Sequence, residues 1–191
     1  MKNALAHSHD LLGALISHFP QGTFVDATLG KGNDSAFILQ SPLFNGRVIG
    51  IDIQAKALQI SQERLSAFNY DNLHLIQADH ADLELYFDQL NCQLIHGAIF
   101  NLGYLPGANH QIATHKNSTY KALNAIAKRL VPQGQIILVI YSGHSQGAEE
   151  KSFLLEALRT WPQDQFTIAH LDYLNQINSP PSLLIIERNN N

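Results

Sequence analysis

The chain has 191 residues, of which 45% are hydrophobic and 15% charged, and this composition excludes a disordered protein. Its length suits one hydrophobic core, so we expect a single domain over residues 1–191. The net charge of −4 argues against a protein that grips duplex nucleic acid through many phosphates.

The sequence predicts a cytoplasmic protein that does not enter a membrane. Asp10 and three histidines interrupt the apolar residues of the first segment, which is unlike a secretory signal. No apolar run approaches the roughly 20 residues that span a bilayer. Cys92 is the one cysteine and cannot form an internal disulfide. It lies in an apolar stretch, which favours a packing role over a nucleophilic one.

Helices and strands alternate along the first half of the chain. Apolar residues at helical spacing predict a helix over 4–18, and a short apolar strand follows over 23–28. A helix begins after Gly32, with Asn33 or Asp34 as its cap. The next predicted elements are a buried strand over 47–53, a helix over 54–68, a strand over 72–79 and a short helix over 81–90.

The second half continues the alternation and then ends it. We expect a strand over 93–101, a helix over 117–130, a turn at 132–134, a strand over 135–141 and a helix over 148–160. Strands over 166–174 and 182–189 have no helix between them, so they should be antiparallel neighbours. The pattern predicts a doubly wound α/β fold with a seven-stranded, mostly parallel sheet and a C-terminal antiparallel strand, the Rossmann-like layout of class I methyltransferases.

Glycines and acids gather where the first three strands end. Gly30 and Gly32 follow the first strand, where glycine lets the backbone approach a ligand closely. Asp26, Asp52 and Asp79 stand at the carboxyl edge of the predicted sheet, where ligands of such sheets bind. Asp52 is placed to accept hydrogen bonds from the hydroxyls of a ribose. Helix capping is the alternative role for Asp52 and Asp79.

Three carboxylates would repel a pyrophosphate but suit a cationic ligand. S-adenosylmethionine carries an ammonium and a sulfonium and has no phosphate, so it fits this pattern. A dinucleotide-binding oxidoreductase would normally have a third glycine where this chain has Ser35. The predicted cofactor is therefore S-adenosylmethionine.

Six motifs carry a resemblance to a known family: DATLGKGNDS, GIDI, QAD, FNLGYLPG, YSGHSQG and NQINSPP. Between Asp26 and Glu187 the chain resembles the rRNA methylase family, which includes the MnmM-type tRNA 5-(aminomethyl)-2-thiouridine methyltransferases. The resemblance implies methylation of the aminomethyl nitrogen on a wobble uridine, with a tRNA anticodon stem-loop as partner. Asn33 stands where we expect His, and Ala108-Asn109 where relatives tend to have Gly-Asp.

The resemblance also implies which residues form the site. The residues that would hold the cofactor are Asp26, Thr28, Gly30, Gly32, Asn33, Asp34, Asp52, Ile53, Gln54, Ala78, Asp79 and His80. The residues that would face the acceptor amine are Asn101, Leu102, Gly103, Tyr104 and Pro106, with Tyr141, Gly143, His144 and Gly147 as the opposite wall.

The acceptor loop resembles the (D/N)PPY loop of amino methyltransferases. The Asn101 side-chain oxygen and the Leu102 carbonyl would accept hydrogen bonds from the amine, which gains positive charge during transfer. Tyr104 would stack on the uracil ring. His144 or Tyr141 would take a proton from the amine, unless His144 only orients its loop.

Several alternatives remain open at this point. Ribosomal RNA or a small amine is an alternative acceptor, and a nucleotide-binding module without turnover is an alternative function. Basic residues of one segment form either an RNA-binding patch or a solvated helix face: Lys116, Lys121, Lys128 and Arg129. A homodimer would widen the surface available to RNA. The scattered histidines show no ligand spacing, so we expect no metal.

Overall fold

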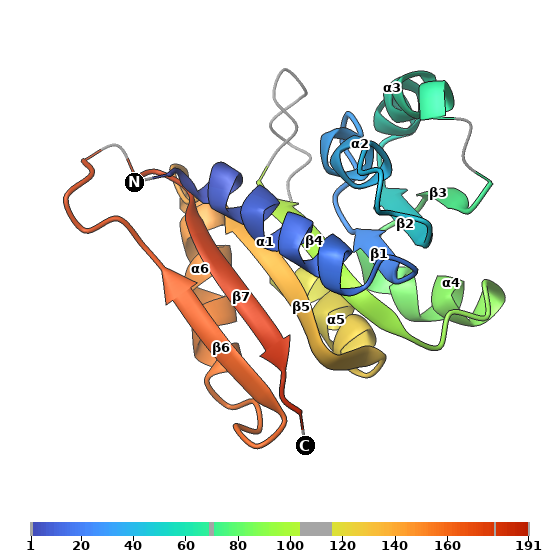
Figure 1. Ribbon diagram of the computed structural model, residues 1–191. Coiled ribbons are helices and arrows are strands. Elements are labelled where there is room, and N and C mark those ends of the chain that lie inside the picture. Colours follow the sequence, from blue (N-terminus) through green and yellow to red (C-terminus); the bar gives the residue numbers. More distant parts are fainter. Residues whose placement is uncertain (1, 69–70, 104–115, 178, 191) are drawn as a thin grey trace.

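The computed structural model describes residues 2–68, 71–103, 116–177 and 179–190. One seven-stranded sheet runs through it in the order β3-β2-β1-β4-β5-β7-β6 (Figure 1). Strands β1 to β5 are parallel, whereas β7 is antiparallel to both of its neighbours. The strands are β1 (Thr23–Asp26), β2 (Arg47–Asp52), β3 (Leu73–Gln77), β4 (Ile95–Leu102), β5 (Leu130–Ile140), β6 (Phe166–Leu171) and β7 (Ser182–Arg188).

Helices cover both faces of the sheet, which confirms the predicted doubly wound α/β class. One face carries α1 (Ala4–His18), α2 (Asn33–Leu39) and α3 (Ala55–Leu65). The other carries α4 (Leu83–Gln89), α5 (Lys116–Ala127) and α6 (Ser145–Leu158). Two 3₁₀ turns, η1 (Ser66–Phe68) and η2 (His80–Asp82), complete the described elements.

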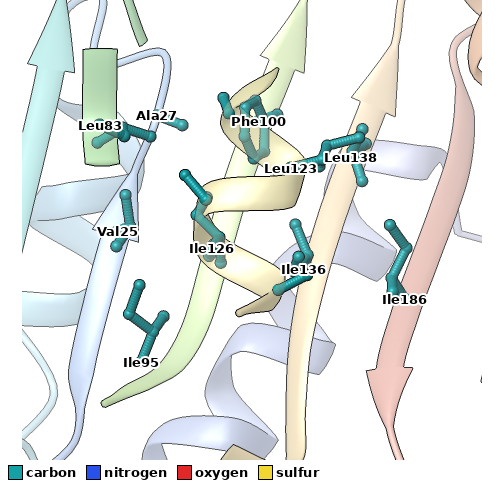
Figure 2. Packing of buried hydrophobic residues seen from close by; sticks show 14 of the residues in the cluster. Val25, Ala27, Leu83, Ile95, Phe100, Leu123, Ile126, Ile136, Leu138 and Ile186 are labelled. Atoms are coloured by element: carbon teal, nitrogen blue, oxygen red, sulfur yellow. The ribbon is translucent and has the colours of Figure 1, made fainter. Parts of the chain in front are cut away.

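Successive side chains of a strand point to opposite faces of the sheet, so each face has its own hydrophobic core. In β1, Phe24 packs with α1 and α2, whereas its neighbour Val25 packs on the side of α4 and α5. Figure 2 shows the core on the face covered by α4 and α5, where Leu123 and Ile126 of α5 lie over the strands. Both side chains are fully buried, as is Ile136 of β5. Removing this apolar area from water fixes α5 on the sheet.

Several element boundaries differ from the predicted ones, and two of these differences have a cause in the structure. The turn expected at 132–134 lies inside β5 as a bulge, because Ile95 of β4 pairs with Leu130 while Gly97 pairs with Gln135. Gln133 takes up the bend with a φ of 64°. Helix α6 begins at Ser145 rather than at 148, because His144 caps its first turn.

The last two strands are antiparallel neighbours, as predicted, and the later strand lies inside the earlier one in the sheet. β6 and β7 pair antiparallel from Phe166↔Arg188 to Leu171↔Leu183. β7 also pairs with β5, so it lies between β5 and β6. Its buried side chains Leu183, Leu184 and Ile186 join both cores.

The candidate basic patch is largely neutralised by carboxylates. Lys121 lies 3.6 Å from Asp82, and both Lys128 and Arg129 pair with Glu84, at 3.0 and 2.8 Å. This arrangement favours an ion-paired helix face over an RNA-binding patch.

Cys92 is 2% exposed, and burial raises the pKa of its thiol. A buried thiol that keeps its proton supports the packing role over the nucleophilic one. Within the described residues, no helix combines the length and the apolar character that crossing a bilayer requires.

Candidate active site

The parallel strands bring the predicted site residues to one edge of the sheet. β1 and β4 are neighbours, and the helices that follow them, α2 and α5, lie on opposite faces. Such a junction is a topological switch point, where α/β sheets bind ligands. Asp26 ends β1 and Asn101 lies near the end of β4, so both stand at this junction.

Asp52 holds the glycine loop against the end of β2. Its Oδ2 accepts the Gly30 N–H at 2.8 Å, and its Oδ1 accepts the Gln54 N–H at 2.9 Å. Gly30 and Gly32 have φ values of 51° and 71°, which favour glycine. A Cβ on Gly32 would also approach the Ser61 Cβ to 3.0 Å. Each carboxylate oxygen of Asp52 retains capacity for another hydrogen bond, so it is compatible with a ribose.

Asp26 is a fully buried carboxyl group with one oxygen left unpaired. Its Oδ2 accepts from the Ser35 hydroxyl at 2.8 Å and from the Ser35 N–H at 3.2 Å. Its buried Oδ1 has no hydrogen bond from the described residues. Burial and the nearby charge of Asp34 raise the pKa of Asp26 to about 7. Such a group gains from a cationic partner.

Asp34 connects three elements through its carboxylate. Its Oδ1 lies 2.7 Å from Nε2 of His9 in α1, and its Oδ2 accepts from Nδ2 of Asn101 at 2.7 Å. The Asn101 backbone N–H donates to the Thr28 hydroxyl at 2.7 Å. Side chain and backbone of Asn101 are therefore both held from the β1–α2 segment.

His9 is the residue that the sequence motifs missed. It lies three and seven residues before Leu12 and Ile16, which are buried, so it shares their face of α1. A histidine on an apolar helix face is the signal that was present in the sequence. Its partner Asp34 is remote in sequence, and only the fold shows their contact.

The segment after β3 adopts the capping arrangement that was the alternative for Asp79. Asp79 Oδ1 accepts the Ala81 N–H at 2.9 Å and begins η2. His80 is 9% exposed and packs edge-on against Phe100, and burial lowers the pKa of its imidazole. Both His80 and the partly buried Ala78 are therefore largely withdrawn from solvent after the end of β3.

Not every predicted residue turns toward this junction. The Asn33 Oδ1 accepts from the Arg64 guanidinium at 2.6 Å, so its side chain is directed to α3. Ile53 is 55% exposed. Tyr104 and Pro106 lie outside the described residues.

The opposite wall is built around the start of α6. The Tyr141 N–H donates to the Leu102 carbonyl at 3.0 Å, extending the β4–β5 ladder. His144 Nδ1 accepts the Gly147 N–H at 2.9 Å as the cap of α6. A Cβ on Gly147 would collide with the Tyr141 carbonyl oxygen, which explains the glycine there. Gly143 is exposed, and a Cβ on it would meet open space.

These contacts weigh against both candidate bases. In a neutral His144 ring whose Nδ1 accepts a hydrogen bond, the proton sits on Nε2, so neither nitrogen is an available acceptor. The pKa of Tyr141 is raised by burial and by the charge of Asp34, so its phenol keeps its proton near neutral pH. The geometry therefore favours the loop-orienting role of His144.

The donor set fits S-adenosylmethionine. The unpaired, buried oxygen of Asp26 suits an ammonium, and Asp52 suits ribose hydroxyls. Ala78 and His80, after the end of β3, are the candidates for contact with an adenine ring. The acids Asp26, Asp34 and Asp52 disfavour a phosphate ligand at the same edge.

Comparison with known proteins shows the family of the chain. Residues 48–187 match the model of the family described as "Putative rRNA methylase". The "tRNA (mnm(5)s(2)U34)-methyltransferase, chloroplastic" of Arabidopsis thaliana is 29% identical over 178 residues, 88% of this chain. That match covers 64% of the Arabidopsis protein, so the chain spans less than two thirds of its length.

Two solved structures superpose over nearly the whole chain. An rRNA-methylase-type protein from Clostridium thermocellum has a TM-score of 0.89 and 39% identity, covering 98% of each chain. A methyltransferase-type protein from Streptococcus mutans, in complex with SAH, has a TM-score of 0.86 and 32% identity, covering 98% of this chain and 99% of its own. The chain therefore belongs to the rRNA methylase family and has the fold of S-adenosylmethionine-dependent methyltransferases.

Proposed function

We propose that the chain is an S-adenosylmethionine-dependent N-methyltransferase that acts on the aminomethyl group of the wobble uridine in tRNA. The product would be 5-methylaminomethyl-2-thiouridine, formed within an anticodon stem-loop. The name of the Arabidopsis relative supports the substrate. The observation that carries the proposal is Asn101, an amide held at the switch point by both Thr28 and Asp34.

The cofactor supplies an electrophilic methyl group when bound. The chain's own part is to bind and orient it: Asp26 faces the ammonium, Asp52 the ribose hydroxyls, and Ala78 with His80 the adenine. Positioning of this kind is the main contribution a protein makes to a direct displacement.

Asn101 is the proposed contact of the acceptor amine. Since its Nδ2 donates to Asp34, its Oδ1 points away from that carboxylate. An oxygen acceptor stabilises the amine more strongly as the nitrogen becomes positive, which favours the transition state over the bound ground state. Leu102 contributes a carbonyl that already accepts the Tyr141 N–H, so it is the weaker candidate. The amine would lose its proton to water before it reaches Asn101.

The second candidate is methylation of ribosomal RNA, which the description of the matched family favours. The test is transfer of labelled methyl groups to aminomethyl-uridine tRNA, unmodified tRNA and ribosomal RNA, followed by nucleoside mass spectrometry. We expect label only on the aminomethyl tRNA. Label on ribosomal RNA alone would contradict the proposed tRNA substrate and favour the second candidate. In Asn101→Ala we expect methyl transfer to be abolished while SAH still binds.

The assembly and location that we propose follow from the sequence. The chain would act as one domain in the cytoplasm, where the single thiol, Cys92, stays reduced. Pairing of two copies would give the anticodon stem-loop a larger surface. Light scattering that reports a monomer in the presence of tRNA would remove the dimer.

A further inference from the structure

One carboxylate joins a histidine of the first helix to the proposed acceptor contact. His9 Nε2 and Asp34 Oδ1 are 2.7 Å apart, and Asp34 Oδ2 accepts from Asn101 Nδ2 at the same distance. The Asp34 side chain is 8% exposed, whereas that of His9 is 30% exposed. The His9 ring is stacked on Phe37, with ring centroids 4.4 Å apart and 21° between the planes. Stacking on Phe37 therefore fixes the His9 ring, and the hydrogen bond to Asn101 fixes the Asp34 carboxylate.

We propose that His9 is a positioning residue for methyl transfer, acting through Asp34 on the orientation of the Asn101 carboxamide. The inference rests on the proposed function, because it takes Asn101 as the contact of the amine. An ionised carboxylate only accepts hydrogen bonds. Asp34 therefore selects the orientation in which Asn101 presents Nδ2 to it and leaves Oδ1 for the substrate.

The hydrogen bond from His9 favours the ionised form of Asp34. Burial and the neighbouring carboxyl of Asp26 both favour a proton on one of the two acids. A donor on Asp34 opposes this, because it stabilises the charged carboxylate. If Asp34 took up a proton, it would donate to Asn101, and the carboxamide would turn to present Nδ2 to the amine. A donor facing an amine that gains positive charge would slow the reaction.

Groups from each neighbouring element bear on the charge of Asp34. Within the described ranges, β1 contributes Asp26, α1 contributes His9, and the segment after β5 contributes Tyr141, whose pKa the Asp34 charge helps to raise. On the side of α3, Arg64 donates to Asn33. Removal of the His9 imidazole would therefore leave Asp34 with the Asn101 hydrogen bond, beside Asp26 and Tyr141.

Two substitutions of His9 distinguish the effect of its hydrogen-bond donor from the effect of its aromatic ring. His9→Phe keeps an aromatic ring against Phe37 and removes the donor, whereas His9→Gln keeps an N–H donor and removes the ring. The matched control is His18→Phe, since His18 is an exposed histidine of the same helix that packs edge-on against Phe19.

The first readout does not depend on activity. The side-chain amide signal of Asn101, assigned by its loss in Asn101→Ala, is followed by ¹⁵N NMR against pH without substrate. We expect the pH of its transition to change in His9→Phe, because the carboxylate that holds Asn101 Nδ2 then lacks the hydrogen bond at its other oxygen. The transition should stay near its original pH in His9→Gln and His18→Phe.

The second readout is the pH profile of turnover with aminomethyl-uridine tRNA. We expect His9→Phe to lower kcat roughly 10- to 100-fold with little change in KM or in SAH affinity, and to move the acid limb upward. His9→Gln should restore most of kcat.

An Asn101 amide that titrates alike in the unsubstituted protein and His9→Phe overturns the inference. Equal losses of kcat in His9→Phe and His9→Gln, with an unmoved pH profile, overturn it as well. If the unsubstituted protein methylates no tRNA, the proposed function fails, and the NMR titration still decides whether His9 sets the orientation of Asn101.

Discussion

The buried carboxyl group of Asp26 makes the folding stability depend on pH. The folded pKa of about 7 lies above the ordinary value of 3.8 because the carboxyl is buried and close to Asp34. The proton is therefore held more tightly in the folded chain than in the unfolded chain. Stability from this group is fully present below about pH 4, declines as the pH rises to about 7, and stays reduced above that.

Asp26→Asn should remove this pH dependence. The amide oxygen can still accept from Ser35, and no charge is buried at any pH. We expect equal melting temperatures near pH 4 and a variant that is more stable by the order of 5 °C at pH 8. Melting curves from pH 4 to 8.5 give the comparison. Parallel curves for the two proteins would mean that folding does not raise the pKa of Asp26.

Thr28 should matter through its hydroxyl. Thr28→Val keeps the shape but leaves the Asn101 N–H without its acceptor, which costs about 1–3 kcal/mol of unfolding free energy. Methyl transfer should fall by roughly ten-fold or more, because Asn101 is displaced. Thr28→Ser retains the hydroxyl and is the control, compared by thermal unfolding and kcat. A Val variant as active as the Ser variant would show that this bond is dispensable.

At the scale of elements, the start of α6 tests the role of His144. An asparagine is a good N-cap but no base, and an alanine is neither. His144→Ala should lose about 1 kcal/mol of stability, whereas His144→Asn should keep both stability and turnover. The measurements are melting temperature and kcat from pH 6 to 9. Equal loss of turnover in both variants would restore His144 as the proton acceptor.

The sequence was sufficient for the order and type of the elements. Helical spacing predicted α1 over 4–18, and apolar runs predicted the two strands that end at Asp26 and Asp52. The errors lie where tertiary contacts override local signals. Pro132–Gly134 looks like a turn but is a bulge, because β5 pairs with β4 on both sides of it.

The residues of the site could be predicted only where they belong to a sequence motif. Asp26, Asp52 and Asn101 lie at the carboxyl ends of parallel strands, so the topology brings them to one edge of the sheet. The contact of His9 with Asp34 depends instead on how α1 packs beside α2, and no local pattern encodes that. The capping role of His144 likewise depended on where α6 begins.

At the scale of the whole molecule, Arg129 ties the corner between α5 and β5 to the adjacent elements. Its side chain is 12% exposed and donates to Glu84, Asp88 and the Cys92 carbonyl. The guanidinium also lies over the Phe87 ring, 5.4 Å from its centroid. One side chain therefore joins α4, the entry to β4 and the start of β5.

Arg129→Met should destabilise the protein by about 1–2 kcal/mol, because the Cys92 carbonyl and Asp88 lose their donor and Glu84 keeps only Lys128. Lys128→Met is the control, since Lys128 is 65% exposed and pairs only at the surface with Glu84. That change should cost less than about 1 kcal/mol. Urea unfolding gives both values, and equal midpoints for the two variants would contradict the special role of Arg129.

The position of β7 between β5 and β6 bears on how the protein is made at the ribosome. β6 is translated first but has no bond to β5, so it cannot join the sheet until residues 182–188 have left the exit tunnel. Until then the outer edge of β5 is an open template for strands of other chains. A ribosome stalled shortly before residue 182 would present that edge, and such nascent chains are where we expect chaperone capture or aggregation.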